Sequence, residues 1–196
     1  MKSISDSALI IVDVQNDFCT GGPLEIYGAE NIIPVINSLV PLFCKIVYTQ
    51  DCHPENHISF SKSPEFKDKS WPQHCVMNTY GVQIHNYLIV DENAVFLKKG
   101  TNPGLEQYSV FDKTGLGDLL KSENIYSVYI AGLATDYCVR YSAIDAAKEG
   151  FSVNVVMDAC AGISDDTVRE TIEDFKKNNV RMVNASEIID MVLAHK

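Results

Sequence analysis

Residues 125–150, IYSVYIAGLATDYCVRYSAIDAAKEG, contain an expected strand, a short turn and an expected helix in direct succession. The apolar run 125–133 predicts a buried strand, and 136–150 predicts a helix that ends at Gly150. Cys138 therefore falls in the first helical turn, just beyond the carboxyl end of a strand. Most cysteines in reduced proteins are small core residues, so the rest of the chain has to decide whether this one is reactive.

Short apolar runs and amphipathic stretches alternate along the rest of the chain. Further strands are expected at 8–14, 45–51, 93–99, 151–159 and 180–185, and helices at 114–123, at 164–179 and after 185. Two prolines in the helically spaced segment 28–43 predict a kinked or stepwise helix. The segment 52–82 shows no period and predicts a long loop. Together these elements predict an α/β fold with a mostly parallel six-stranded sheet and helices on both faces.

The composition limits both the architecture and the partners. A chain of 196 residues, 46% of them hydrophobic, predicts one domain over 1–196. The net charge of −10 and the lack of a basic run argue against nucleic acid and anionic membranes as partners. No apolar run approaches the ~18 residues of a membrane helix. The N-terminus lacks an apolar signal core, and the six cysteines are scattered, so we expect reduced thiols in a cytoplasmic protein.

Three reactive side chains are expected at the carboxyl ends of strands, where parallel sheets bind ligands. Asp13 and Lys99 end two predicted strands, and Cys138 follows a third. Taken alone, Asp13 also suits a structural cap, and Lys99 beside Lys98 also suits a solvated pair. Taken together, they predict that Asp13 takes the thiol proton, Cys138 attacks and Lys99 holds the charges in place. The helix N-terminus should favour the thiolate, and backbone N–H groups near Ala134 and Cys138 could form an oxyanion hole.

A second group of side chains suits a transition metal. Asp51 and His53 stand two residues apart, so an extended chain points both the same way, and His74 returns from the loop. One carboxylate and two imidazoles with open positions suit Zn²⁺, Mn²⁺ or Fe²⁺. A metal bound there would either generate hydroxide or hold the substrate for the thiol, and these residues alone leave both roles open.

Other histidines and cysteines offer further ligands. His57 is a fourth candidate that equally suits a turn or a supporting position, and Cys52 and Cys75 flank the proposed ligands. His85 and His195 have no partners in the sequence pattern and are interpreted as ordinary surface residues.

Several segments together resemble one family. They are IIVDVQNDFCTGGPL (10–24), TQDCHPENHISF (49–60), WPQHCVMNTYG (71–81), VFLKKGTNP (95–103), YSVF (108–111) and AGLATDYCVRYSA (131–143). This set resembles the nicotinamidases, or pyrazinamidases, of the isochorismatase-like hydrolase superfamily, and the match runs from Ala8 to past Ala159. The aspartate, lysine and cysteine motifs mark the superfamily, whereas Asp-x-His with Trp-Pro-x-His-Cys is specific to the nicotinamidase branch.

The resemblance implies a three-layer Rossmann-type fold and a cytoplasmic amidohydrolase of NAD salvage. Such an enzyme converts nicotinamide to nicotinic acid and ammonia through a cysteine thioester, and it would also deamidate pyrazinamide. The resemblance implies catalytic residues at Asp13, Lys99 and Cys138, with Lys99 preferred to Lys98 because it directly precedes the glycine. It implies one divalent ion, zinc or else manganese or iron. The implied metal ligands are Asp51, His53 and His74, without His57.

The resemblance also implies how a small aromatic amide binds. The pyridine nitrogen reaches the metal, directly or through water, and Phe18 and Trp71 sandwich the ring. Plain core packing is the other interpretation of these two side chains. Tyr108 is a further lining candidate, and a cis peptide is expected before Ala134. The superfamily is often oligomeric, so a homo-oligomer is also expected.

Three other functions fit parts of the pattern. The first is another amidohydrolase of the superfamily, acting on a carbamoyl or ureido substrate, although those branches generally lack the metal histidines. The second is a metal- or redox-binding module that uses its cysteines. The third is an isochorismatase proper, against which the metal motif argues.

Overall fold

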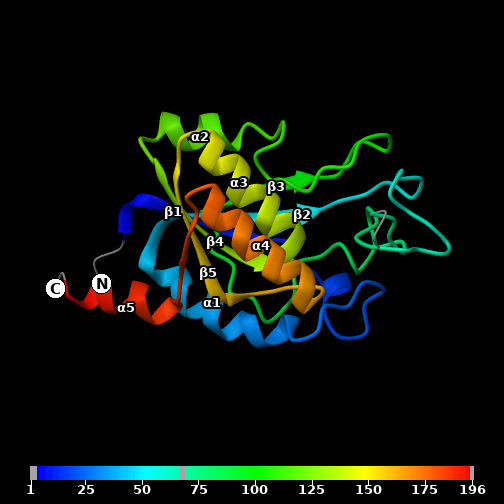
Figure 1. Cartoon of the computed structure of the whole chain (residues 1–196), viewed down its shortest axis with the longest axis horizontal. Coiled ribbons are helices and arrows are strands. Elements are labelled where there is room, and N and C mark those ends of the chain that lie inside the picture. Colours follow the sequence, from blue (N-terminus) through cyan, green and yellow to red (C-terminus); the bar gives the residue numbers. More distant parts are fainter. Residues whose placement is uncertain (1–3, 67–68, 195–196) are drawn as a thin grey trace.

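The computed structural model describes residues 4–66 and 69–194, so His195 lies outside the described residues. Six strands form one parallel sheet in the order β3-β2-β1-β4-β5-β6 (Figure 1). They are β1 (Ile4–Val12), β2 (Phe43–Asp51), β3 (Val95–Lys99), β4 (Ser127–Leu133), β5 (Ser152–Ala161) and β6 (Arg181–Val183). The helices are α1 (Ile33–Leu39), α2 (Leu116–Ser122), α3 (Arg140–Lys148), α4 (Asp165–Lys177) and α5 (Ala185–Ala194). This confirms the predicted six-stranded α/β architecture.

Helices cover both faces of the sheet because β1 and its neighbours are apolar on both sides. Leu9 and Ile11 of β1 belong to one core cluster, together with buried residues of α1 and α5. Ala8 and Ile10 point the other way, into a second cluster with residues of α2, α3 and α4. In Figure 1, α1 and α5 lie below the sheet and α2 and α3 lie above it, while α4 runs beside α3 and overlaps the strands in this view. The continuous apolar run of β1 is therefore explained by burial on two faces.

Two predicted helices are built from shorter pieces. The segment 28–43 consists of a 3₁₀ turn (Ala29–Ile32), α1 and a second 3₁₀ turn (Val40–Leu42). Its prolines stand near the start of α1 and of the second turn, where the missing N–H does least harm. The helix predicted over 136–150 begins with a π-helical turn (Thr135–Val139) and continues as α3. The proposed nucleophile therefore lies in the π-helical turn and not in a regular α-helix.

The long connection between β2 and β3 extends from the carboxyl end of the sheet (Figure 1). Within 52–66 and 69–94 it contains no helix or extended strand, only isolated bridges such as His53 with Val76 and Phe60 with Trp71. The irregular segment is thus longer than the predicted 52–82. A third bridge, between Gln15 and Ile84, joins the connection to the segment that follows β1, at the carboxyl end of the sheet.

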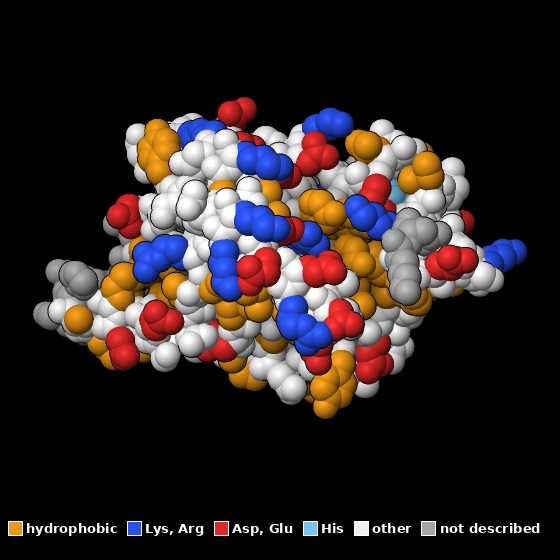
Figure 2. Space-filling view, viewed as in Figure 1, with side chains coloured by type: hydrophobic (Ala, Val, Ile, Leu, Met, Phe, Trp, Pro, Cys, Tyr) orange, Lys and Arg blue, Asp and Glu red, His pale blue; other side chains and the backbone are white. Residues whose placement is uncertain are grey.

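The surface carries charges of both signs, and the buried cysteines are reduced, as the sequence predicts. Figure 2 shows acidic and basic side chains interspersed over the face that carries α3 and α4. Cys19, Cys52, Cys75 and Cys138 are buried and form no disulfide. Among the described residues, no helix has the length and apolar character needed to cross a membrane.

Candidate active site

The proposed catalytic side chains come from neighbouring strands. Asp13 directly follows β1, Asp51 ends β2 and Lys99 ends β3, and these three strands are adjacent in the sheet. Cys138 follows β4, the neighbour of β1 on the other side. Asp51 and Lys99 are register partners across β2 and β3. Parallel strands therefore bring residues that are far apart in sequence to one edge, as the strand-end rule predicts.

Lys99 lies at the centre of the cluster. Its side chain is fully buried, and Nζ lies 2.8 Å from Asp13 Oδ2 and 2.6 Å from Asp51 Oδ1. Nζ also donates to Cys138 Sγ at 3.2 Å. Burial alone would lower the pKa of Lys99, but the two carboxylates raise it well above its usual value. Lys98 is exposed, so Lys99 and not Lys98 belongs to the buried cluster with Asp13, Asp51 and Cys138.

Asp13 is held beside the thiol by the end of β2. Its backbone N–H donates to Thr49 O at 3.3 Å, and Thr49 Oγ1 donates to Asp13 Oδ1 at 2.6 Å. A carboxylate oxygen of Asp13 lies within 4.8 Å of Cys138 Sγ. Burial raises the pKa of the Asp13 carboxyl above its usual value, although Lys99 acts in the opposite direction. The carboxylate is thereby a stronger base than an exposed aspartate.

Burial and neighbouring charges act on the thiol of Cys138. Burial raises the pKa of the Cys138 thiol well above its usual value, and Lys99 offsets this only in part. The physical reason is that Cys138 is 5% exposed and faces two carboxylates as well as one ammonium group. The thiol at rest therefore keeps its proton until a base removes it.

Asp51, His53 and His74 meet on the same side of the pocket. One ligand atom from each lies within 4.8 Å of the others. Asp51 Oδ2 is 3.5 Å from His53 Nε2 and 3.9 Å from His74 Nε2. Burial would raise the pKa of Asp51, but Lys99 and His53 hold it well below its usual value, so the carboxylate is charged.

The imidazoles are oriented as metal ligands are. His53 Nδ1 lies 3.0 Å from Gly100 O, and His74 Nδ1 lies 2.8 Å from Pro72 O. A carbonyl can only accept, so each Nδ1 carries a proton, and in the neutral ring each Nε2 presents a lone pair. Burial lowers the pKa of His74 to about 4, so its ring is neutral near pH 7. These residues fit a divalent transition metal in donor type and in orientation.

The other candidate ligands are differently placed. His57 Nδ1 lies 2.8 Å from Ser59 Oγ and His57 Nε2 lies 3.1 Å from Leu105 O, so both nitrogens are already paired. Cys75 is fully buried, and burial raises the pKa of its thiol well above the usual value. Cys52 is also buried, and burial raises its thiol pKa.

His85 is less isolated than the sequence indicated. One of its ring nitrogens lies within 4.8 Å of Cys19 Sγ and of a Glu30 carboxylate oxygen. However, Tyr87 N donates to His85 Nδ1 at 3.3 Å, and Thr20 N donates to Glu30 Oε1 at 2.7 Å. Protein donors therefore already use part of this cluster.

One pocket joins the metal-type residues to the thiol. It is lined by Phe18, Leu24, Ile26, Asp51, His53, Trp71, His74, Glu106, Tyr108, Ala134, Tyr137, Cys138 and Ile163. Phe18, Trp71 and Tyr108 thus share the pocket wall, as expected, and Trp71 Nε1 donates to Tyr108 Oη at 3.0 Å. The peptide bond before Ala134 is cis, as the resemblance implied.

Sequence reasoning missed part of the wall. Leu24, Ile26 and Tyr137 look like ordinary apolar residues in the sequence, whereas the strand-end rule could have identified Ile163, just beyond β5. Glu106 carries a buried Oε2 with no hydrogen-bond partner among the described residues. An uncompensated acidic oxygen on this wall is a second observation that favours a cation in the pocket.

Comparisons with known proteins agree with this geometry. The isochorismatase domain family matches residues 7–187. The nicotinamidase of Acinetobacter baylyi is 37% identical, with 96% of this chain and 97% of that protein covered. The pyrazinamidase of Pyrococcus horikoshii in complex with zinc has a TM-score of 0.83 at 39% identity, covering 91% of this chain and 99% of its own.

A third relative adds a ligand to the comparison. The yeast nicotinamidase bound to the inhibitor nicotinaldehyde has a TM-score of 0.82 at 32% identity, covering 91% of this chain and 99% of its own. Each comparison covers at least 91% of this chain and at least 97% of the relative, so no large segment of these three relatives is unmatched. On the fold and on these similarities, the chain belongs to the isochorismatase family and, within it, to the nicotinamidase branch.

Proposed function

We propose that this protein is a nicotinamidase, an amidohydrolase that converts nicotinamide to nicotinic acid and ammonia. The observation that carries the proposal is a buried cluster of thiol, base and ammonium group whose thiol lines the same aromatic pocket as an Asp-His-His group. A ring that binds between aromatic side chains would present its carboxamide to Cys138. Pyrazinamide, which has a similar ring and the same amide, is proposed as a second substrate.

The proposed reaction has two covalent stages. Asp13 takes the proton of Cys138, and the sulfur forms a bond to the amide carbon. The carbon–nitrogen bond then breaks, and Asp13 returns the proton to the departing ammonia. Water next attacks the thioester, giving Asp13 a proton that passes back to the sulfur as the acid leaves. Lys99 stays charged throughout and balances the negative charge that moves between oxygen and sulfur.

The oxygen of the tetrahedral intermediates needs donors of its own. We propose the backbone N–H groups of Ala134 and Cys138, which belong to the turn that carries the nucleophile and line the same pocket. Such donors stabilise charge that develops only in the transition state, and removing one donor typically costs about 10²–10³-fold in rate.

The proposed metal ligands are Asp51, His53 and His74. When bound there, a divalent ion would supply a Lewis acid for the ring nitrogen of the substrate. Zinc is proposed because the donor set suits it and because the Pyrococcus horikoshii pyrazinamidase is in complex with zinc.

Replacing His74 by alanine should remove the bound metal. The variant loses one of two imidazole ligands, so metal content measured by mass spectrometry should fall from about one ion per chain to a small fraction of that. His85→Ala is the matched control, because His85 lies outside the pocket, and it should keep its metal. Equal metal content in both variants would contradict the proposed ligand set.

Gln15 should tune metal affinity without binding the metal. Its Oε1 accepts from Asp51 N at 2.9 Å and its Nε2 donates to Asp51 O at 2.8 Å, so its amide fixes the backbone of one ligand. Gln15→Met should weaken zinc binding by about 10- to 100-fold, as loss of a supporting partner does.

Gln50 provides the control for this prediction. Its Nε2 donates to Val82 O at 2.6 Å, an acceptor that Gln15 Nε2 also reaches, at 2.8 Å. Within the described residues, no hydrogen bond joins the Gln50 side chain to Asp51, so Gln50→Met should leave zinc affinity unchanged in a chelator competition. Equal weakening by both variants would show that the shared contact to Val82 matters and that the Asp51 contact does not.

A panel of amides tests the function itself. Ammonia release should be fast with nicotinamide and pyrazinamide and slow with benzamide, because benzamide lacks the ring nitrogen. Carbamoyl and ureido compounds belong to the alternative amidohydrolase function and should give no ammonia. Turnover of a ureido compound in preference to nicotinamide would overturn the proposal.

The wider setting is also proposed. The product, nicotinic acid, is a precursor for NAD salvage, and buried cysteines without disulfides suit the cytoplasm. We further propose that 1–196 forms one catalytic domain. Nucleic acid and membranes are not proposed as partners, and the expected homo-oligomer remains a prediction.

A further inference from the structure

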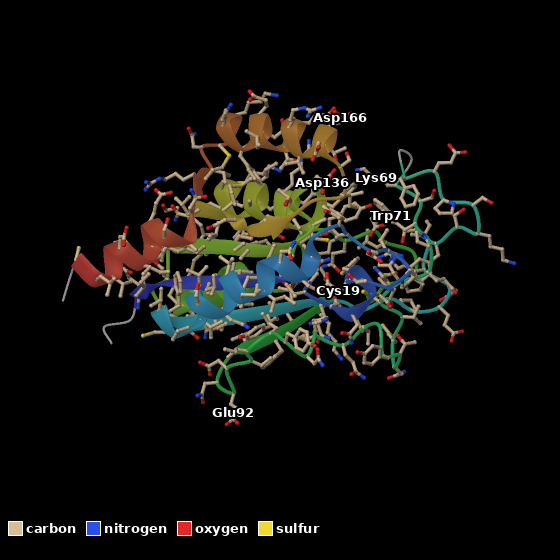
Figure 3. The ribbon with its side chains drawn as sticks, turned by 90° about the horizontal axis from the view of Figure 1, so that it is seen from below. Cys19, Lys69, Trp71, Glu92, Asp136 and Asp166 are labelled. Carbon is tan, nitrogen blue, oxygen red and sulfur yellow. The ribbon has the colours of Figure 1, made fainter. Side chains whose placement is uncertain are left out.

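A buried carboxylate lies two residues before the proposed nucleophile. Asp136 is 1% exposed and belongs to the π-helical turn that carries Cys138 (Figure 3). In the described part of the chain, no lysine or arginine forms an ion pair with it. A buried carboxylate is costly unless hydrogen bonds replace its lost water, so the donors around Asp136 are significant.

These donors all come from the loop after β5 and from the start of α4. Ile163 N donates to Asp136 Oδ1 at 3.0 Å, and Ser164 N donates to Oδ2 at 3.4 Å. The hydroxyl of Thr167 donates to Oδ2. Ser164 is the N-cap of α4, and its Oγ lies 2.7 Å from Thr167 Oγ1. The hydroxyl of Thr167 therefore links the Asp136 carboxylate to Ser164, the N-cap residue of α4.

The loop after β5, which is hydrogen-bonded to Asp136, also forms part of the pocket. Ile163 lines that pocket together with Cys138. The chain passes so close at Gly162 that a Cβ there would lie 2.3 Å from Val168 Cγ2 and 3.2 Å from Asp136 Oδ1. Glycine is therefore needed for this approach, and the carboxylate fixes a loop that is already packed against α4.

We propose that Asp136 is a positioning residue. By binding the start of α4, it fixes the position of Cys138 relative to Ile163, which forms part of the pocket wall. Asp136 is not among the residues that line the pocket. It acts by fixing the turn from which both the sulfur and the proposed oxyanion donors project. This inference rests on the proposed function of Cys138 as the nucleophile.

Thr167→Val is the sharpest probe, because it removes one donor to Asp136 while keeping the size of the side chain. The sulfur would lose its fixed position, and misplacement of a reacting group by about 1 Å can cost 10²-fold in rate. We expect kcat to fall by about 10- to 100-fold with little change in KM. Thr167→Ser keeps the hydroxyl and should restore kcat.

Thr171→Val is the matched control in the same helix. Thr171 is fully buried, and its hydroxyl donates to Thr167 O within α4, so its loss affects stability without touching Asp136. Its kcat should equal that of the unmodified protein even if its Tm falls. If Thr167→Val and Thr171→Val lower kcat equally, or if kcat follows Tm across the variants, Asp136 has only a general structural role.

Nicotinaldehyde provides a readout that is independent of turnover. A thiol adds to an aldehyde by forming a carbon–sulfur bond while the proton moves to oxygen, so affinity reports on the position of Cys138. The Ki should rise in Thr167→Val by about the factor lost in kcat and stay unchanged in Thr171→Val. An unchanged Ki in both variants would overturn the proposal.

Failure of the proposed function has a different signature. If Cys138→Ala hydrolyses nicotinamide as fast as the unmodified protein, the thiol mechanism is wrong. If Cys138→Ala is inactive but the threonine variants behave alike, only the role of Asp136 is wrong.

Discussion

Replacing Cys138 by alanine is expected to lower nicotinamide hydrolysis by at least about 10⁴-fold, the scale on which loss of a covalent nucleophile acts. A thioester requires sulfur, and Asp13 and Lys99, which form an ion pair at 2.8 Å, offer no replacement nucleophile. Ammonia release, with zinc content and Tm measured on the same sample, checks the result. Metal content should be unchanged, because sulfur is not among the proposed ligands.

Cys44→Ala is the control for this prediction. Cys44 is exposed and stands near the start of β2, seven residues before Asp51, or roughly 23 Å away along an extended strand. Its replacement should leave hydrolysis unchanged. Full activity in Cys138→Ala with zinc bound would instead assign the attack to a metal-generated hydroxide, the role that the sequence left open.

Replacing Lys99 by methionine should both inactivate and destabilise the protein. The ammonium group lies between two buried carboxylates, at 2.8 Å from Asp13 and 2.6 Å from Asp51. Removing one partner of a buried ion pair leaves an uncompensated charge and typically costs about 3–5 kcal/mol. Urea unfolding should show a loss on this scale, and ammonia release should fall below detection.

Lys98→Met is the matched control, since Lys98 is the exposed neighbour on the same strand. It should change neither the free energy of unfolding nor the rate. The double variant Asp13→Asn with Lys99→Met separates the two effects of Lys99, because it removes one carboxylate charge together with the amine. It should regain part of the stability while remaining inactive. A Lys99→Met protein as stable as Lys98→Met would contradict the proposed role of Lys99 as a buried counter-ion.

The cluster at the carboxyl ends of the strands was predictable from the sequence, because a parallel sheet places all of these ends on one side. Once strands alternate with helices, the carboxyl ends of strands must face one side, and residues that end them must meet there. Asp13, Lys99 and Cys138 lie together for that reason. The Asp-x-His pair was equally readable, because alternate residues of a strand share a face.

Other features depend on contacts that a sequence pattern does not contain. Lys98 and Lys99 point to opposite sides of a strand, and without the family resemblance only the packing of β3 shows which of them is buried. Burial raises the pKa of the Cys138 thiol, and an argument from helix position does not include burial. The contact between Asp136 and Thr167 joins two turns 31 residues apart, and neither residue has a pattern that indicates it.

Carbon-13 NMR of nicotinaldehyde labelled at the carbonyl carbon tests covalent attack by the Cys138 sulfur most directly. The unmodified, zinc-loaded protein should give a tetrahedral carbon signal typical of a carbon bonded to sulfur and oxygen, and Cys138→Ala should lack it. A bound aldehyde or hydrate with the same chemical shift in both proteins would contradict covalent catalysis by this cysteine.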